Sequence, residues 1–121
     1  MATEIINSKR FFQLWSYSVS HSELLFRSTK SAGFSTRIDV LFKGVSALHL
    51  PETCDGLLVT EASEADIRKL CTLRQSPSFG KDVKVFTVQG AGFIGYIAAL
   101  IALCHEDEGE YNEPSYFAPK K

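Results

Sequence analysis

ELLFRSTKSAGFSTRIDVLFK, residues 23–43, is the stretch that decides the fold of this 121-residue chain. Apolar and polar residues alternate on both sides of a loop over residues 28–35, which contains Gly33. Alternation with a period of two is typical of strands with one buried face, and a Gly-containing loop between two such segments indicates an antiparallel hairpin. The predicted buried face consists of Leu24, Phe26, Ile38, Val40 and Phe42.

Further strands are predicted on both sides of this hairpin, over residues 45–50, 57–60 and 83–88. Residues 11–27 lack Gly and Pro and are rich in aromatic residues and Ser, which favours extended structure. A helix over residues 8–16 stays open, because Phe11, Leu14 and Trp15 also fit helical spacing. Residues 96–104 fit either structure, and the aromatic and β-branched residues Phe93, Tyr96, Ile97 and Ile101 favour a strand.

One helix is predicted after these strands. Ser63 precedes Glu64 and Asp66, a pattern in which the Ser side chain accepts a first-turn N–H and the acids lie at the positive end of the helix dipole. A narrow apolar stripe follows, made of Ile67, Leu70, Cys71 and Leu73. We therefore expect one amphipathic helix over residues 63–75, packed on a face or edge of the sheet with Cys71 buried.

These elements predict an α+β protein with a largely antiparallel sheet of about six to seven strands and the single helix over residues 63–75. A chain of 121 residues suits one compact domain, 1–121, and a loosely ordered C-terminal tail over residues 114–121 stays open. With 45% apolar and 22% charged residues, the composition excludes a disordered or fibrous chain.

Charge and cysteine usage limit the expected partners and compartment. The pI of about 6.3 is far from the value above about 9 that is typical of nucleic-acid-binding domains. The longest apolar run, residues 93–104, is shorter than the roughly 20 residues of a membrane-spanning helix, and no signal peptide pattern is present. The odd number of widely spaced cysteines indicates reduced thiols. We expect a cytoplasmic protein with no nucleic acid or membrane partner, and its oligomeric state stays open.

Residues 90–95 read Gly-Ala-Gly-Phe-Ile-Gly, a G-x-G-x-x-G pattern between a predicted strand and an apolar run. This pattern resembles the dinucleotide fingerprint of short-chain and extended dehydrogenases, which implies a nucleotide at the glycine-rich turn. In that family the fingerprint opens a βαβ unit with an acidic residue about 20 positions later. Only 26 residues follow Gly95 here, so we predict a hairpin loop over Gly90–Gly95 instead, with Gly95 at a bulge or close backbone approach. Nucleotide binding is the remote alternative.

The polar face of the hairpin is the first candidate site. If Arg27 pairs with Arg37, then His21, Arg27, Arg37 and Asp39 share one outward face. Two arginines on such a face could bind an anionic ligand, and a small ligand-binding protein or enzyme using these residues is our alternative function. The favoured interpretation is the ordinary solvated side of an antiparallel sheet.

The acidic segment, residues 106–113, is the second candidate site, because it holds five of the fourteen acidic residues. Its charges could act as gatekeepers that keep the neighbouring apolar run from aggregating. They could also form a docking surface for a basic protein partner, with Tyr111 and Tyr116 as aromatic anchors. We expect the segment to be exposed, because burying its carboxylates would need paired cations that the local sequence lacks. The residues predicted to bind a partner are Glu106, Asp107, Glu108, Glu110 and Tyr111.

No pattern in the sequence predicts catalysis. His49 stands alone in an apolar stretch, no His, Cys or carboxylate spacing suits a metal, and no G-x-S-x-G elbow is present. We therefore predict no metal and no cofactor. The expected function is that of a non-catalytic interaction or binding protein, immunity-like or accessory, that covers a basic partner surface with its acidic segment.

Overall fold

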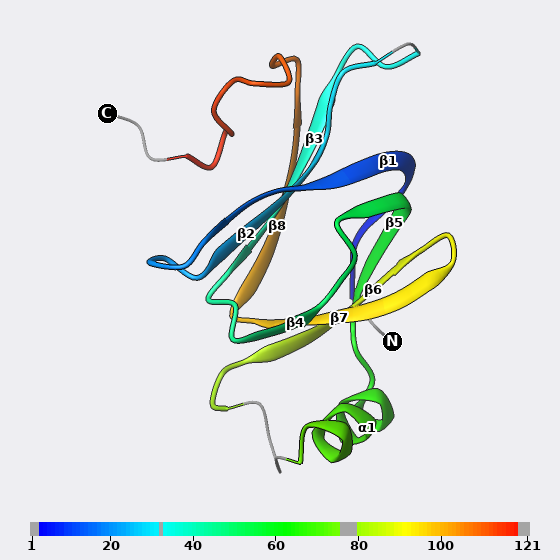
Figure 1. Cartoon of the computed structure of the whole chain (residues 1–121), viewed down its shortest axis with the longest axis vertical. Coiled ribbons are helices and arrows are strands. Elements are labelled where there is room, and N and C mark those ends of the chain that lie inside the picture. Colours follow the sequence, from blue (N-terminus) through cyan, green and yellow to red (C-terminus); the bar gives the residue numbers. More distant parts are fainter. Residues whose placement is uncertain (1–2, 32, 76–79, 119–121) are drawn as a thin grey trace.

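The computed structural model of the chain describes residues 3–31, 33–75 and 80–118. These residues form one eight-stranded antiparallel sheet and one helix (Figure 1). The expected class, an antiparallel sheet with a single helix, is confirmed, and the sheet has eight strands where six to seven were expected. The strands are β1 (Glu4–Ser18), β2 (Glu23–Ser28), β3 (Arg37–Lys43), β4 (Ala47–His49), β5 (Thr53–Glu61), β6 (Lys84–Gly90), β7 (Phe93–Ala99) and β8 (Ile101–Asp107).

Strands β2 and β3 form the predicted hairpin, and all five residues of its predicted buried face belong to the hydrophobic core. The expected pairing of Arg27 with Arg37 is wrong. Arg27 lies opposite Asp39, and Arg37 lies opposite Asp107 of β8. The register differs from the expected one by two residues, which changes the neighbours of each side chain and leaves every side chain on its predicted face.

The segment that could also fit a helix, residues 8–16, is extended and belongs to β1, which pairs with β5 along its first part and with β2 along its last. The register of β1 shifts at three places, between Glu4 and Ile6, between Ser8 and Phe11, and between Leu14 and Ser16. Such irregularities bend a strand and increase its twist. One strand of 15 residues can therefore pair with β5 along its first part and with β2 along its last part.

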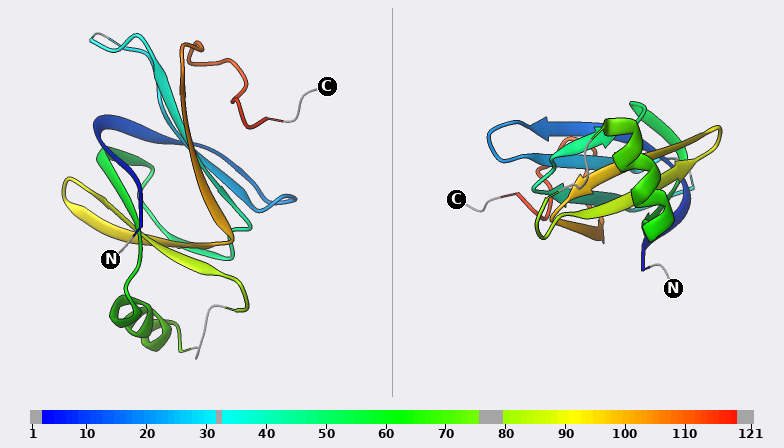
Figure 2. Two further views of the ribbon diagram at one scale, coloured as in Figure 1. Left: turned by 180° about the vertical axis from the view of Figure 1, so that it is seen from behind. Right: turned by 90° about the horizontal axis from the view of Figure 1, so that it is seen from below.

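The apolar run over residues 93–104 is extended, as favoured, but it contributes to two strands that meet at Leu100. β7 pairs with β6 and β4, whereas β8 pairs with β3. The strand order is β4-β7-β6-β5-β1-β2-β3-β8, so two strands joined by one residue lie near opposite ends of the order. The sheet must therefore roll on itself, as Figure 2 shows, and Leu100 N donates to Lys43 O at 2.9 Å at this corner.

The rolled sheet encloses the core. The fully buried rings include Phe12, Phe26, Phe42 and Phe86, and the last two meet edge to face with centroids 5.7 Å apart. The core side chains of one part of the sheet are thus covered by other parts of the same sheet.

The glycine motif is a hairpin turn, as predicted. Gly90 pairs with Phe93, which leaves Ala91 and Gly92 as a two-residue turn between β6 and β7. Gly92 has φ +81° and Ala91 has no positive φ, which is the pattern of a type II turn, and glycine adopts this φ without strain. Gly95 is the predicted close approach, since a Cβ there would collide with the main-chain oxygen of His49 on β4.

Helix α1 (Glu64–Arg74) is one residue shorter at each end than the predicted 63–75, with Ser63 and Gln75 as its caps, and the Ser63 side chain accepts from Asp66 N at 3.2 Å. The expected packing is wrong. None of the described side chains of α1 is buried, Leu73 is 80% exposed, and Cys71 is half-buried. Figures 1 and 2 show α1 beyond one end of the sheet. Ile67, Leu70 and Cys71 of the stripe are half-buried, and Leu73 is exposed. Within the described residues, no helix is long and apolar enough to span a membrane.

Candidate functional site

The outer face of β2, β3 and β8 carries the first candidate site. Successive strand residues point to opposite faces, so the residues between those of the core point outward. Two cross-strand rows result, Leu25–Leu41–Leu103 and Arg27–Asp39–His105. The predicted solvation of this face is wrong for its arginines and for Asp39. Arg27 is 2% exposed, Asp39 is 1% exposed, and Arg37 is buried as well.

The cover over this face is the C-terminal strap, which we define as residues 108–118. β8 ends at Asp107, and the chain then turns back over the sheet (Figure 2). Of the tail over residues 114–121, residues 119–121 lie outside the described part of the chain. The remainder of this tail contacts the sheet through Pro114 and the two rings that follow it.

Arg27 joins the sheet to the strap. Its Nε and Nη2 donate to the two carboxylate oxygens of Asp39 at 2.7 and 3.0 Å. Its Nη1 donates to the main-chain oxygens of Tyr111 and Glu113 at 2.8 and 3.1 Å. The Trp15 ring lies over the guanidinium group, with 5.0 Å between Cζ and the ring centroid. Bidentate, charge-assisted bonds of this kind are among the strongest that side chains make.

Arg37 makes a second junction of the same design. Its Nε and Nη2 donate to the carboxylate oxygens of Asp107 at 2.7 and 3.3 Å. Three main-chain oxygens of the strap also accept from it, those of Glu110, Glu113 and Pro114, at 2.7 to 3.0 Å. The hydrogen bond from Arg37 holds the pKa of Asp107 below its usual value. A Cβ on Gly109 would lie 2.5 Å from Arg37 Cζ, so the guanidinium needs a glycine there.

Aromatic rings hold the end of the strap. Tyr116 stacks on His105 with centroids 3.8 Å apart and an interplanar angle of 15°. Phe117 meets the same imidazole edge to face, with centroids 6.0 Å apart. The strap is therefore held at its middle by two arginines and near its end by one histidine of β8.

The acidic segment overlaps the strap, and the arginines bind it mainly through main-chain oxygens. The side chains of Glu106, Glu108, Glu110 and Glu113 are exposed, as expected, and Asp107 is half-buried. The paired cations that the local sequence lacks come from a distant part of the chain. Arg37 pairs with Asp107, and Lys30 Nζ lies 3.0 Å from Glu110 Oε1. Both cations lie on or beside the loop between β2 and β3, about 70 to 80 residues earlier in the chain.

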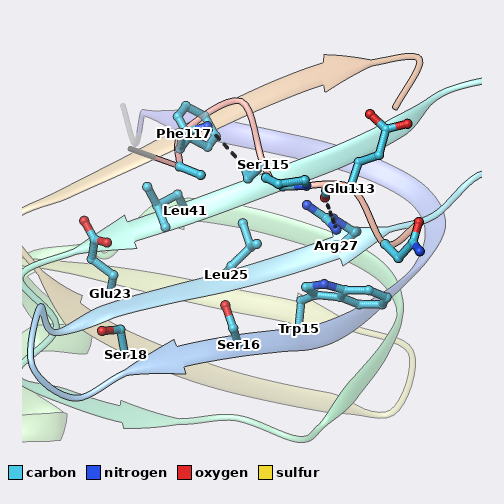
Figure 3. A pocket seen from close by; sticks show the side chains of 13 residues that line it. Trp15, Ser16, Ser18, Glu23, Leu25, Arg27, Leu41, Glu113, Ser115 and Phe117 are labelled. Carbon is cyan, nitrogen blue, oxygen red and sulfur yellow. Dashed lines mark hydrogen bonds between the residues drawn. The ribbon is translucent and has the colours of Figure 1, made fainter. Parts of the chain in front are cut away.

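A cavity of about 360 Å³ lies between the strap and the outer face of the sheet, and we call it the strap groove (Figure 3). Leu25 and Leu41 line it from the sheet, and Pro114 and Phe117 line it from the strap. Glu23 lies toward one end and Trp15 toward the other (Figure 3).

The structure brings together three of the four residues predicted to bind an anion. Arg27 and Arg37 donate to the same carbonyl oxygen, that of Glu113, and Asp39 is bound to Arg27. His21 is not part of this cluster. It lies exposed in the turn between β1 and β2, at the opposite end of β2 from Arg27.

Other candidates for chemistry are spread over the molecule. Cys54, Cys71 and Cys104 are unpaired, as expected, and burial raises the pKa of the Cys54 thiol to about 11, which disfavours the nucleophilic thiolate. His49 lies on edge strand β4 and stacks on Tyr96. Among the described residues, no three His, Cys, Asp or Glu side chains gather as metal ligands would.

The sequence analysis missed the role of Trp15, His105 and Gly109 at this site. The available signals were a glycine inside an acidic run and the Tyr116–Phe117 pair after it. A comparison of the chain with known protein families, curated proteins and solved structures finds no match.

Proposed function

We propose that this is a non-catalytic interaction protein whose acidic segment docks on a basic surface of a protein partner. The observation that carries the proposal is the way in which Arg27 and Arg37 bind the segment. They bind main-chain oxygens of four strap residues, which fixes the path of the backbone. Four of the five carboxylates of the segment are left exposed.

A fixed backbone supports binding because less conformational entropy is lost when a partner docks. Clustered carboxylates also attract a basic partner over a distance and accelerate encounter at low salt. Tyr111 and Tyr116 are exposed beside the carboxylates, and tyrosines are frequent anchors at protein interfaces. The exposed carboxylates and the two rings thus lie close together in the chain, on the end of β8 and on the strap.

Anion binding by Arg27, Arg37 and Asp39 has less support, because the guanidinium groups already donate to carboxylates and carbonyls of the chain itself. Nucleotide binding at Gly90–Gly95 also lacks support, since turn geometry and strand packing account for Gly92 and Gly95.

The test compares two variants with three neutralised carboxylates each. The segment variant combines Glu106→Gln, Glu108→Gln and Glu110→Gln. It keeps Asp107, so the ion pair between Asp107 and Arg37 stays intact. The matched control, Glu4→Gln, Glu52→Gln and Asp82→Asn, neutralises three exposed carboxylates elsewhere. Partners captured from cells that make the protein are identified by mass spectrometry, purified and titrated by calorimetry.

We expect a basic partner whose Kd rises at least tenfold with the segment variant, stays unchanged with the control, and rises with salt. Equal binding by all three proteins would overturn the proposed function.

A further inference from the structure

The strap groove is apolar in its middle. Leu25 and Leu41 on the sheet lie below Phe117 of the strap (Figure 3), and Pro114 of the strap also lines the groove. Its volume of about 360 Å³ is near the lower end of the range of about 300–1,000 Å³ in which small-molecule sites fall. The groove therefore has room for one extended side chain and not for a large cofactor.

Negative charge lies at the edges of the groove. Glu23 and Glu113 line it, and the positive charge of Arg27 is balanced by Asp39 within the sheet. Glu23 pairs with Lys43, whose Nζ lies 3.8 Å from Oε2. The Glu23 side chain is half-buried at 33% exposure and that of Lys43 is exposed at 49%, and a long pair that is open to water contributes little to stability. Glu23 can therefore exchange this neighbour for another cation at little cost.

We propose that the strap groove receives one lysine or arginine side chain of the docking partner. These side chains combine an apolar stem with a charged head. The stem packs between Leu25 and Phe117, and the charged head pairs with Glu23 beside the hydroxyls of Ser16 and Ser18. The inference rests on the proposed function, because the side chain comes from the basic partner that the acidic segment attracts.

Trp15 makes the groove directly observable, because it is the single tryptophan of the chain and lines the groove. The fluorescence of the intact protein is titrated with three blocked pentapeptides that carry lysine, arginine or norleucine between pairs of glycines. Norleucine supplies the apolar stem without the charge. We expect a saturable change with the lysine or the arginine peptide and at least tenfold weaker binding of the norleucine peptide. No change with either basic peptide, or equal binding of all three, would overturn the inference.

A second set of titrations tests whether the charged head pairs with Glu23. Glu23→Gln should lower the affinity for the basic peptides to that for the norleucine peptide. Glu52→Gln, which neutralises an exposed carboxylate that does not line the groove, should leave all affinities unchanged. The midpoint of thermal unfolding of each variant confirms that it is folded. If Glu23→Gln binds the basic peptides as the unaltered protein does, the assignment is overturned.

The partner separates this inference from the proposed function. A partner that depends on residues 106–113 but binds Glu23→Gln with unchanged Kd would overturn the groove inference alone. Binding of basic peptides that requires Glu23, together with partner binding that ignores residues 106–113, would support the groove inference and overturn the proposed function.

Discussion

Helix α1 and the C-terminal strap both leave the sheet, and they are attached to it in opposite ways. By local sequence α1 is the well-defined element, with a capping serine and a narrow apolar stripe. None of its described side chains is buried. The strap has no regular secondary structure, yet two buried arginines and a stacked histidine hold it on the sheet. Local regularity thus says little about attachment, which depends on partners elsewhere in the chain.

The difference lies in where the main-chain polar groups find partners. A helix satisfies most of its own N–H and C=O groups and needs packing only to hold it in place. Among the described residues of the strap, only Glu113 N and Ala118 N donate to main-chain oxygens of the strap itself, those of Glu110 and Ser115, so most of its carbonyl groups need other donors. Arg27 and Arg37 supply the missing donors from the sheet. The predictions that follow test whether the strap is firmly bound and the helix loosely bound, beginning with the largest effect.

Replacement of Arg27 by Met should have the largest effect on stability. The change leaves the carboxylate of Asp39, which is 1% exposed, without its cation and removes two bonds to the strap. Removing one member of a buried ion pair costs about 3–5 kcal/mol, and urea unfolding measures this loss. The double variant Arg27→Met with Asp39→Leu should recover much of it, because no buried charge is then left unpaired. A single variant that loses less than about 1 kcal/mol would contradict the structural role of the pair.

Gly109→Ala should weaken the strap without removing a charge. The new Cβ would lie 2.5 Å from Arg37 Cζ, so the guanidinium group or the strap must move. We expect a loss of about 1–3 kcal/mol in urea unfolding, as for other overpacked sites. Faster amide hydrogen exchange over residues 108–118 should accompany this loss. Glu108→Ala is the matched control at an exposed neighbour, and an equal effect of the two changes would show that the space at Gly109 is not limiting.

Attachment of the strap should also weaken in acid. The hydrogen bond from Arg37 lowers the pKa of Asp107 in the folded protein, so this interaction stabilises the fold above the unfolded pKa of about 3.9 and is lost as the pH falls. Asp107→Asn should cost about 1 kcal/mol at neutral pH, and its difference from the unaltered protein should shrink between about pH 5 and pH 3. Urea unfolding across this range measures it. A difference that is constant with pH would mean that the charge of Asp107 is not involved.

The parts of the structure that the sequence predicts are those with local causes. Alternation over residues 23–43 is enough to place Leu24, Phe26 and Phe42 in the core, because a strand's faces are set by the strand itself. The turn at Gly92 and the helix cap at Ser63 also depend on a few adjacent residues. For the same reason the predicted faces of β2 and β3 are correct although their predicted register is wrong by two residues.

The remaining features depend on residues far apart in the chain. The acceptors of Arg27 on the strap lie 84 and 86 residues away, and no local pattern indicates that its charge is buried. The change of strand partner at Leu100 falls inside an apolar run. In such a run the hydrophobic periodicity does not indicate which strand pairs with which. The expected packing of α1 was wrong for a related reason, since the place of a helix relative to the sheet depends on residues far from it in the chain.

Cys71→Ser in α1 should have the smallest effect. On a buried helix stripe this change would place a hydroxyl in apolar surroundings and cost about 1–3 kcal/mol. Cys71 is only half-buried and α1 has no buried described side chain, so the hydroxyl keeps its contact with water. We therefore expect the free energy of unfolding in urea to change by less than about 0.5 kcal/mol, as for other surface substitutions. A loss of 1 kcal/mol or more would show that the stripe is buried in solution, and the contrast between the helix and the strap would then fail.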